Sequence, residues 1–195
     1  MSTRTKQAAL LMVDMSVEQV ASLSPSRTKL IIKTIQQMLA CGKFSVKIDS
    51  RLWLESDKES TLSRVYPEWG VTMGVPNSNG AALIPQLLAP DKWEFIPKKH
   101  YSSFVDAPLL MERLQSQQIT DVFLVGINTD YCIFNTAMDS FSRGRFTTHV
   151  VEEGVGSISG SQGHAQGLAW IRAHLGADAV VSVSQVLGML GEGES

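Results

Sequence analysis

Cys132 has the sequence surroundings of a reactive thiol. The β-rich apolar run 122–125 ends at Gly126, and after a polar turn apolar residues recur at helical spacing from Ile133 onward. This pattern predicts that Cys132 lies in the first turn of a helix, where unpaired amides and the helix dipole favour a thiolate. The same amides could hold an oxyanion. The alternative is a small buried hydrophobic residue, because free cysteines are among the most buried residues.

Asp14 and Lys98 also follow short apolar runs. Residues 8–13 are continuously apolar, as in a strand of a parallel sheet, and Asp14 stands at the carboxyl end, where open α/β sheets place ligand-binding groups. A helix cap or a solvated loop position would also account for Asp14. Lys98 and Lys99 follow the run 93–96, and two adjacent lysines are more often solvated than functional.

The elements that must position these residues alternate along the chain. Helical segments separate the apolar runs, which favours an α/β fold with a parallel sheet covered by helices on both faces. The length of 195 residues fits a single domain spanning 1–195. The glycine-rich stretch 154–163 lacks the spacing of a phosphate loop and is interpreted as a loop that enters a helix. Strands are expected at 8–13, 44–48, 93–96, 121–125, 146–151 and 179–183.

The amino-acid composition limits the classes of partner that this protein is expected to bind. The chain has 17 basic and 19 acidic residues and a net charge of −2, without a dense basic cluster, so we expect no nucleic-acid or membrane partner. The apolar runs are much shorter than a membrane span and no secretory leader is evident, which favours a cytoplasmic protein. Cys41 and Cys132 are the only cysteines and do not form a CxxC motif, so neither a disulfide framework nor a structural zinc site is indicated.

Three segments together resemble the isochorismatase-like cysteine hydrolases. The family's cysteine signature is similar to GINTDYCIFNTAMDSFSRG at 126–144, its opening strand with a terminal aspartate to AALLMVDM at 8–15, and its lysine segment to PKKHYSSF at 97–104. Their order and spacing also match, so the resemblance covers essentially the whole chain. It implies a three-layer, Rossmann-like α/β/α fold with a six-stranded parallel sheet in the order 3-2-1-4-5-6.

The resemblance also implies a cysteine amidohydrolase that needs no cofactor. Asp14 would take the thiol proton, Lys98 would stabilise the thiolate, and Cys132 would attack a small amide or ureido (N-carbamoyl) substrate to give a thioester. The amides of Asn128 and Cys132 would form the oxyanion hole, beside a cis bond between Ile127 and Asn128. Family members commonly assemble as oligomers, so a homo-oligomer is expected.

The metal site of the related nicotinamidases is not matched. Those enzymes have an Asp-x-His pair and a later histidine, whereas this chain has Asp49, Arg51 and Trp69 at the matching positions. Because arginine stays protonated and cannot donate a lone pair, we predict no catalytic metal. Arg51 could instead bind a substrate carboxylate or ureido group, or form a surface ion pair with Glu55 or Asp57.

Ile127, Trp69 and Phe104 are further candidates for contact with the substrate. Aromatic residues at such positions could line a pocket, block it or cover the core. Gln19 stands where nicotinamidases have an aromatic residue that would stack on the nicotinamide ring, which argues against that substrate. Two other functions remain open: a metal-dependent nicotinamidase-like enzyme, and a non-catalytic binding or scaffold protein on the same fold.

Overall fold

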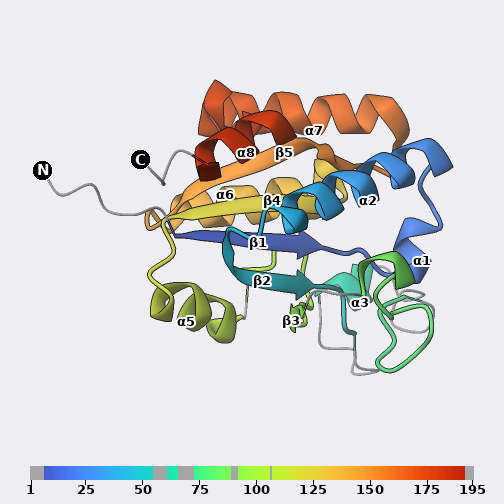
Figure 1. Cartoon of the computed structure of the whole chain (residues 1–195). Helices are drawn as coiled ribbons and strands as arrows, with labels where there is room; N and C mark the ends of the chain where they lie inside the picture. Colours follow the sequence, from blue (N-terminus) through green and yellow to red (C-terminus); the bar gives the residue numbers. More distant parts are fainter. Residues whose placement is uncertain (1–6, 55–60, 66–72, 89–91, 106, 192–195) are drawn as a thin grey trace, which may run out of the picture.

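A twisted parallel sheet of six strands forms the middle layer of the protein (Figure 1). The computed structural model describes residues 7–54, 61–65, 73–88, 92–105 and 107–191. The strand order is β3-β2-β1-β4-β5-β6 and all the pairings are parallel, which confirms the order implied by the resemblance. The strands are β1 Ala8–Val13, β2 Phe44–Ser50, β3 Glu94–Phe95, β4 Asp121–Ile127, β5 Thr147–Gly156 and β6 Val180–Val181.

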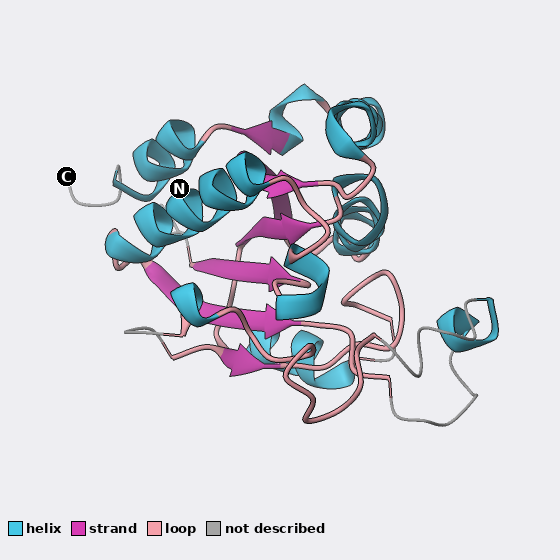
Figure 2. Cartoon of the chain, turned by 90° about the vertical axis from the view of Figure 1, so that its right-hand side faces the viewer, coloured by secondary structure: helices cyan, strands magenta, loops and turns pink. Residues whose placement is uncertain are grey.

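Helices cover both faces of the sheet (Figure 2). The side chains of β1 alternate between two cores, because successive residues of a strand point to opposite faces. Leu11 packs in the core with residues of α5, α6 and α7, whereas Leu10 packs with residues of α1, α2 and α8. The helices are α1 Val17–Val20, α2 Pro25–Ala40, α3 Thr61–Val65, α5 Pro108–Ser116, α6 Phe134–Ser142, α7 Gly160–Leu175 and α8 Val183–Gly191.

Local signals explain where the long helices begin and end. Ser24 caps α2 by accepting a hydrogen bond from the Arg27 amide at 3.4 Å, and proline occupies the first helical position. Helix α7 stops at Gly176, whose φ of 98° no other residue type adopts easily. None of the described helices is both long enough and apolar enough to cross a membrane.

The edge strands β3 and β6 are shorter than expected, and the segment that follows residue 153 differs in type from the sequence-based expectation. The glycine-rich stretch from residue 154 was expected to be a loop, but β5 continues through Gly156. The pairing of β5 with β4 shifts in register between Leu124 and Gly126, so an irregularity separates its two halves. Small residues suit this part of β5, because a Cβ on Gly154 would come within 2.8 Å of Val125 Cγ1.

The carboxyl ends of β1 and β4 lie side by side. Val13 pairs with Gly126, and a Cβ at position 126 would lie 2.0 Å from the Val13 carbonyl oxygen. Gly126 also has a φ of 111°, so glycine is required there on both counts. Consequently Asp14, which follows β1, and the turn after Ile127, which follows β4, leave the sheet next to each other.

Candidate active site

Asp14 is buried at the end of β1 in a left-handed backbone conformation. Its φ is 55°, a region that aspartate tolerates better than most residues and that often occurs at functional sites. The Asp14 amide donates to the Ser50 carbonyl oxygen at 2.9 Å, and carboxylate oxygen Oδ1 accepts from the Leu52 amide at 2.9 Å. The carboxylate is therefore oriented by the residues that follow β2.

Lys98 joins Asp14 to Cys132. The Nζ atom lies 2.7 Å from Asp14 Oδ2 and 3.4 Å from Cys132 Sγ, and it also donates to the carbonyl oxygens of His100 and Tyr101. The side chains of Asp14 and Lys98 are inaccessible to solvent. Burial opposes the lysine charge, but Asp14 and Cys132 outweigh it and raise the pKa of Lys98.

The backbone of Lys98 extends the pattern of the sheet beyond β3. Its amide donates to the Arg51 carbonyl oxygen at 3.0 Å, and its own carbonyl oxygen accepts from the Trp53 amide at 2.9 Å. This pairing turns Lys98 inward, whereas the neighbouring Lys99 is exposed. Of the two adjacent lysines, Lys98 is thus the one that lies beside Asp14 and Cys132.

Cys132 lies in a helical turn that begins directly after β4. Residues Thr129–Ile133 form a π-helical turn, in which the Ile133 amide donates to the Asn128 carbonyl oxygen at 2.9 Å, and α6 continues from it. The placement at the start of a helix agrees with the prediction. The prediction of an acidic thiol was wrong for the free protein: burial raises the pKa of Cys132 to about 12, Asp14 adds to the rise, and Lys98 opposes it.

Asn128 precedes this turn and faces the same space as Cys132. The Ile127–Asn128 peptide bond is cis, as the resemblance implied. The side-chain oxygen Oδ1 of Asn128 accepts a hydrogen bond from the Ile158 amide at 2.9 Å, which orients the carboxamide. The loop after β5 therefore supports the loop after β4.

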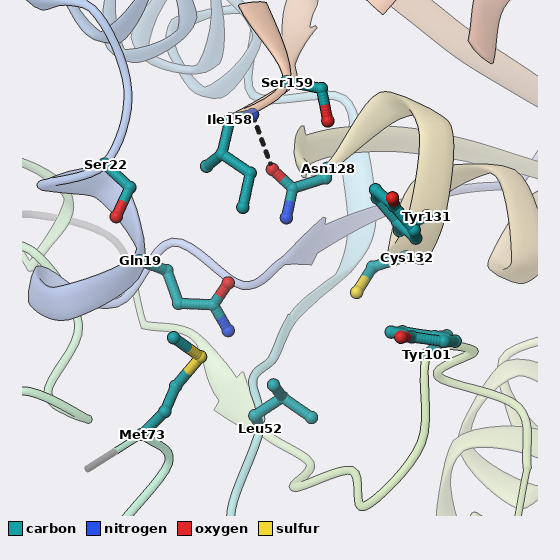
Figure 3. A pocket seen from close by; sticks show the side chains of 10 residues that line it. All are labelled: Gln19, Ser22, Leu52, Met73, Tyr101, Asn128, Tyr131, Cys132, Ile158 and Ser159. Atoms are coloured by element: carbon teal, nitrogen blue, oxygen red, sulfur yellow. Dashed lines mark hydrogen bonds between the residues drawn. The ribbon is translucent and has the colours of Figure 1, made fainter. Parts of the chain in front are cut away.

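A pocket of about 170 Å³ opens in front of Cys132 (Figure 3). The rings of Tyr101 and Tyr131 lie with their centroids 5.8 Å apart at one side of it. This volume is below the ~300–1,000 Å³ typical of drug-sized ligands, so the pocket suits a small molecule. The described residues that line it are Gln19, Ser22, Leu52, Met73, Tyr101, Asn128, Tyr131, Cys132, Ile158 and Ser159.

The described residues that were predicted to contact the substrate are not found among those that line the pocket. Ile127 and Phe104 are buried in the two cores on opposite faces of the sheet, and neither is among the residues that line the pocket. Trp69 lies outside the described residues. Arg51 does not line the pocket either, because its side chain is held elsewhere.

Arg51 forms a buried ion pair with Asp49. Its Nε lies 2.9 Å from both Asp49 carboxylate oxygens, Nη1 donates to the Ala81 carbonyl oxygen, and the guanidinium carbon lies 4.7 Å from the centroid of the Phe95 ring. The partner is therefore Asp49; Glu55 and Asp57 lie outside the described residues. Burial raises the pKa of Asp49 to about 6, although Arg51 opposes the rise.

The residues at this position do not fit the metal of the nicotinamidases. A guanidinium has no lone pair to donate, and it already occupies both oxygens of Asp49. Within the described ranges, no group of three or more His, Cys, Asp or Glu side chains is arranged to hold a metal ion. Asp49 and Arg51 therefore do not provide ligands for a catalytic metal.

Several residues that line the pocket were not singled out from the sequence. Ile158 and Ser159 follow the carboxyl end of β5, so the rule that drew attention to Asp14 could have found them. Tyr131 could have been noted as the neighbour of Cys132. Ser22 and Met73 carry no comparable signal, because loops far apart in the sequence bring them together.

The fold and the buried Asp, Lys and Cys cluster define a class of α/β proteins with a candidate nucleophile at the carboxyl edge of the sheet. Solved structures share this fold. A cysteine hydrolase from Pseudomonas syringae pv. phaseolicola 1448A has a TM-score of 0.81 at 18% identity, covering 96% of this chain and 93% of that one. The nicotinamidase/pyrazinamidase PncA from Bacillus subtilis has a TM-score of 0.75 at 19% identity, covering 90% and 100%.

Sequence comparison identifies the family. The isochorismatase domain model matches residues 8–183, and the chain belongs to this hydrolase family. An uncharacterized isochorismatase family protein PncA of Bacillus subtilis (strain 168) is 32% identical over 83 residues, which span 43% of this chain and 44% of that protein. The match thus covers less than half the length of that relative.

Proposed function

We propose that this protein is a cysteine amidohydrolase that cleaves a small amide or ureido substrate through a thioester, with Asp14, Lys98 and Cys132 as its catalytic residues. One observation carries the proposal: Lys98 Nζ lies within 2.7 Å of a carboxylate oxygen of Asp14 and 3.4 Å from a sulfur that lines a pocket. A base, a cation and a nucleophile in contact are what acyl transfer through cysteine requires.

The first half of the reaction moves one proton and forms one bond. With its raised pKa, Cys132 rests as a thiol, so its proton passes to the Asp14 carboxylate as Sγ attacks the carbonyl carbon. The oxyanion then lies against the amides of Asn128 and Cys132, each such donor being worth about 3 kcal/mol. Asp14 returns the proton to the departing nitrogen, the C–N bond breaks, and a thioester remains on Cys132.

The second half uses the same groups in reverse. Asp14 removes a proton from a water molecule that attacks the thioester carbon, and the same oxyanion site holds the developing charge. The C–S bond then breaks and the thiol recovers its proton. Lys98 stays charged throughout, which limits the cost of negative charge on either Asp14 or the sulfur in a buried site.

Metal independence is part of the proposal. Arg51 and Asp49 neutralise each other at 2.9 Å and take no part in the proposed steps. Treatment with a chelator should therefore leave turnover unchanged. Loss of turnover with the chelator and recovery with zinc or iron would favour the alternative of a metal-dependent, nicotinamidase-like enzyme.

The thioester is the intermediate to test. The wild-type protein would be mixed with a panel of small primary amides and ureido compounds, ammonia release would be followed, and acid-quenched samples would be digested for mass spectrometry. We expect an acyl group on the peptide that contains Cys132 for each compound that releases ammonia. Cys132→Ala should release none, whereas the matched variant Cys41→Ala should behave as wild type.

The outcomes separate the candidate functions. Ammonia release that persists in Cys132→Ala would contradict cysteine catalysis. A wild-type protein that binds small amides without any acylation or ammonia release would instead support the non-catalytic binding protein.

A further inference from the structure

The side-chain carboxamide of Gln19 lines the pocket and makes no hydrogen bond to another described residue. The residue is only 6% exposed, and its backbone amide donates to Ser16 Oγ at 3.4 Å, but its side chain has no partner among the described residues. Figure 3 shows that this side chain extends from α1 into the pocket, toward the side on which Asn128 and Cys132 lie. Because it faces the cavity without a protein partner, this carboxamide can use its donors and its acceptor to bind a ligand.

Helix α1 holds Gln19 in place. The amides of Val17 and Glu18 donate to the carbonyl oxygens of Ala82 and Gly80, each at 3.0 Å, and Ser16 caps the helix. These bonds tie α1 to the loop that contains residues 80–82. Gln19 is therefore presented to the pocket by a short helix fixed at both its start and its side, which makes its position suitable for recognition.

Asn128 presents a second amide to the same space. The Ile158 amide can only donate, so the atom it meets at 2.9 Å is the Asn128 side-chain oxygen, and the NH2 group is turned to the pocket (Figure 3). Asn128 thus offers hydrogen-bond donors, while Gln19 offers both donors and an acceptor. A ligand group that accepts and donates, such as a carboxamide or a urea, satisfies both residues.

The surroundings disfavour a charged group at this place. None of the described residues that line the pocket is charged. Arg51 is neutralised by Asp49, and Arg27, in the adjoining pocket, donates to the carbonyl oxygens of Val155 and Glu152. Lys98, 3.4 Å from Cys132 Sγ, is already paired with Asp14 at 2.7 Å. A carboxylate bound beside Gln19 would therefore lose its water without gaining an unpaired cation from the described residues, which is far more costly than burial of a neutral amide.

We infer that Gln19 determines substrate specificity: the substrate carries a second, uncharged polar group next to the reacting carbon, and Gln19 binds it. The substrates would be neutral diamides or ureido amides, and their carboxylate analogues would be rejected. This inference rests on the proposed function, because it assigns the substrate class of the same site.

Iodoacetamide and iodoacetate test the inference without any need for turnover. In both reactions Sγ displaces iodide from a methylene carbon, the thiol proton is lost to base, and the reagents differ only in carrying a carboxamide or a carboxylate. The rate of each at Cys132 would be measured by peptide mass spectrometry. Glutathione, a thiol without a binding pocket, gives the reference value of the iodoacetamide-to-iodoacetate rate ratio. The thiolate fraction cancels in this ratio, because both reagents react with the thiolate.

The comparison between variants isolates Gln19. In wild type, the iodoacetamide-to-iodoacetate rate ratio at Cys132 should exceed that of glutathione by about tenfold or more. Gln19→Met keeps the length of the side chain but removes its hydrogen bonds, and should reduce that excess by about fivefold to tenfold through slower iodoacetamide labelling. Gln166→Leu changes an exposed glutamine on α7 and should keep the wild-type ratio.

Three results would overturn the inference: a wild-type ratio equal to that of glutathione, a high ratio that Gln19→Met leaves unchanged, or a Cys132 inert to both reagents in the folded protein. Selective labelling without acylation by any amide would leave Gln19 as a binding determinant and reject the proposed hydrolysis. Acylation without selective labelling would support the proposed hydrolysis and reject Gln19 as the binding determinant.

Discussion

Replacing Asp14 with asparagine should speed the alkylation of Cys132 while it abolishes turnover. The buried carboxylate raises the pKa of the thiol and also neutralises Lys98 at 2.7 Å. Asparagine keeps the shape of the side chain but removes its charge. The Lys98 ammonium then acts on the sulfur without opposition and should lower the pKa of Cys132. Turnover fails because the group that accepts the thiol proton is gone.

The distance between Lys98 Nζ and Cys132 Sγ sets the size of the effect. At 3.4 Å, a full charge on each atom and an effective dielectric constant of about 20 give an attraction of about 5 kcal/mol. Asp14 cancels much of it in wild type, so we expect the pKa of Cys132 to fall from about 12 by about three units. The thiolate fraction at about pH 8 then rises about a thousandfold. Because a less basic thiolate is also less nucleophilic, the net acceleration is about thirtyfold to sixtyfold.

The assay is iodoacetamide labelling of Cys132 across pH, read by peptide mass spectrometry with Cys41 in the same molecule as the reference. Asp178→Asn, which removes an exposed carboxylate, should label like wild type. Ammonia release from any accepted amide should fall by about a hundredfold or more in Asp14→Asn. Labelling of Cys132 in Asp14→Asn that is unchanged or slower than in wild type would refute this account of the charges.

Two further predictions concern residues that surround the candidate active site. Gly126→Ala should lower the free energy of unfolding in urea by more than about 3 kcal/mol, because φ is 111° and the new Cβ would lie 2.0 Å from the Val13 carbonyl oxygen. Gly144→Ala, with a φ of 62° and open space, should cost only about 1–2 kcal/mol, and equal losses would contradict the packing argument. Burial and Arg27 lower the pKa of His164 to about 4, so its NMR titration should have its midpoint there. Since this pKa lies below that of the unfolded chain, stability should be lost as pH falls from about 6.5 toward 4, and His164→Gln should remove that loss.

The sequence could predict the positions of the two central strands, β1 and β4, because each contains a short apolar run between segments of another period. Residues 8–13 and 122–125 are buried on both faces of the sheet and are apolar throughout, which is visible locally. The caps of α2 and the glycine after α7 are equally local signals. The edge strand β3 has only two residues, both exposed, so its expected length of four was too long.

The chemistry of the candidate residues was also visible in the sequence, but their charge states were not. The helix dipole at Cys132 depends on a few neighbouring residues and favours a thiolate. The burial of Cys132 and its proximity to the Asp14 carboxylate depend on packing against β1, which is more than a hundred residues away in the sequence. These two effects outweigh the helix dipole and raise the pKa of Cys132 to about 12. Spacing gave no sign that Arg51 would turn to Asp49 or that Gln19 would be left unpaired in the pocket.

The sequence by itself thus determined the class of fold and which residue types stand at the carboxyl ends of the strands. Only the tertiary structure decided that Lys98 lies between Asp14 and Cys132, that Arg51 is withdrawn from the pocket and that Gln19 faces it. The physical reason is the distance along the sequence over which each effect acts. Hydrophobic periodicity and capping are short-range properties of the chain, whereas desolvation and the field of a neighbouring charge depend on which distant segments pack together.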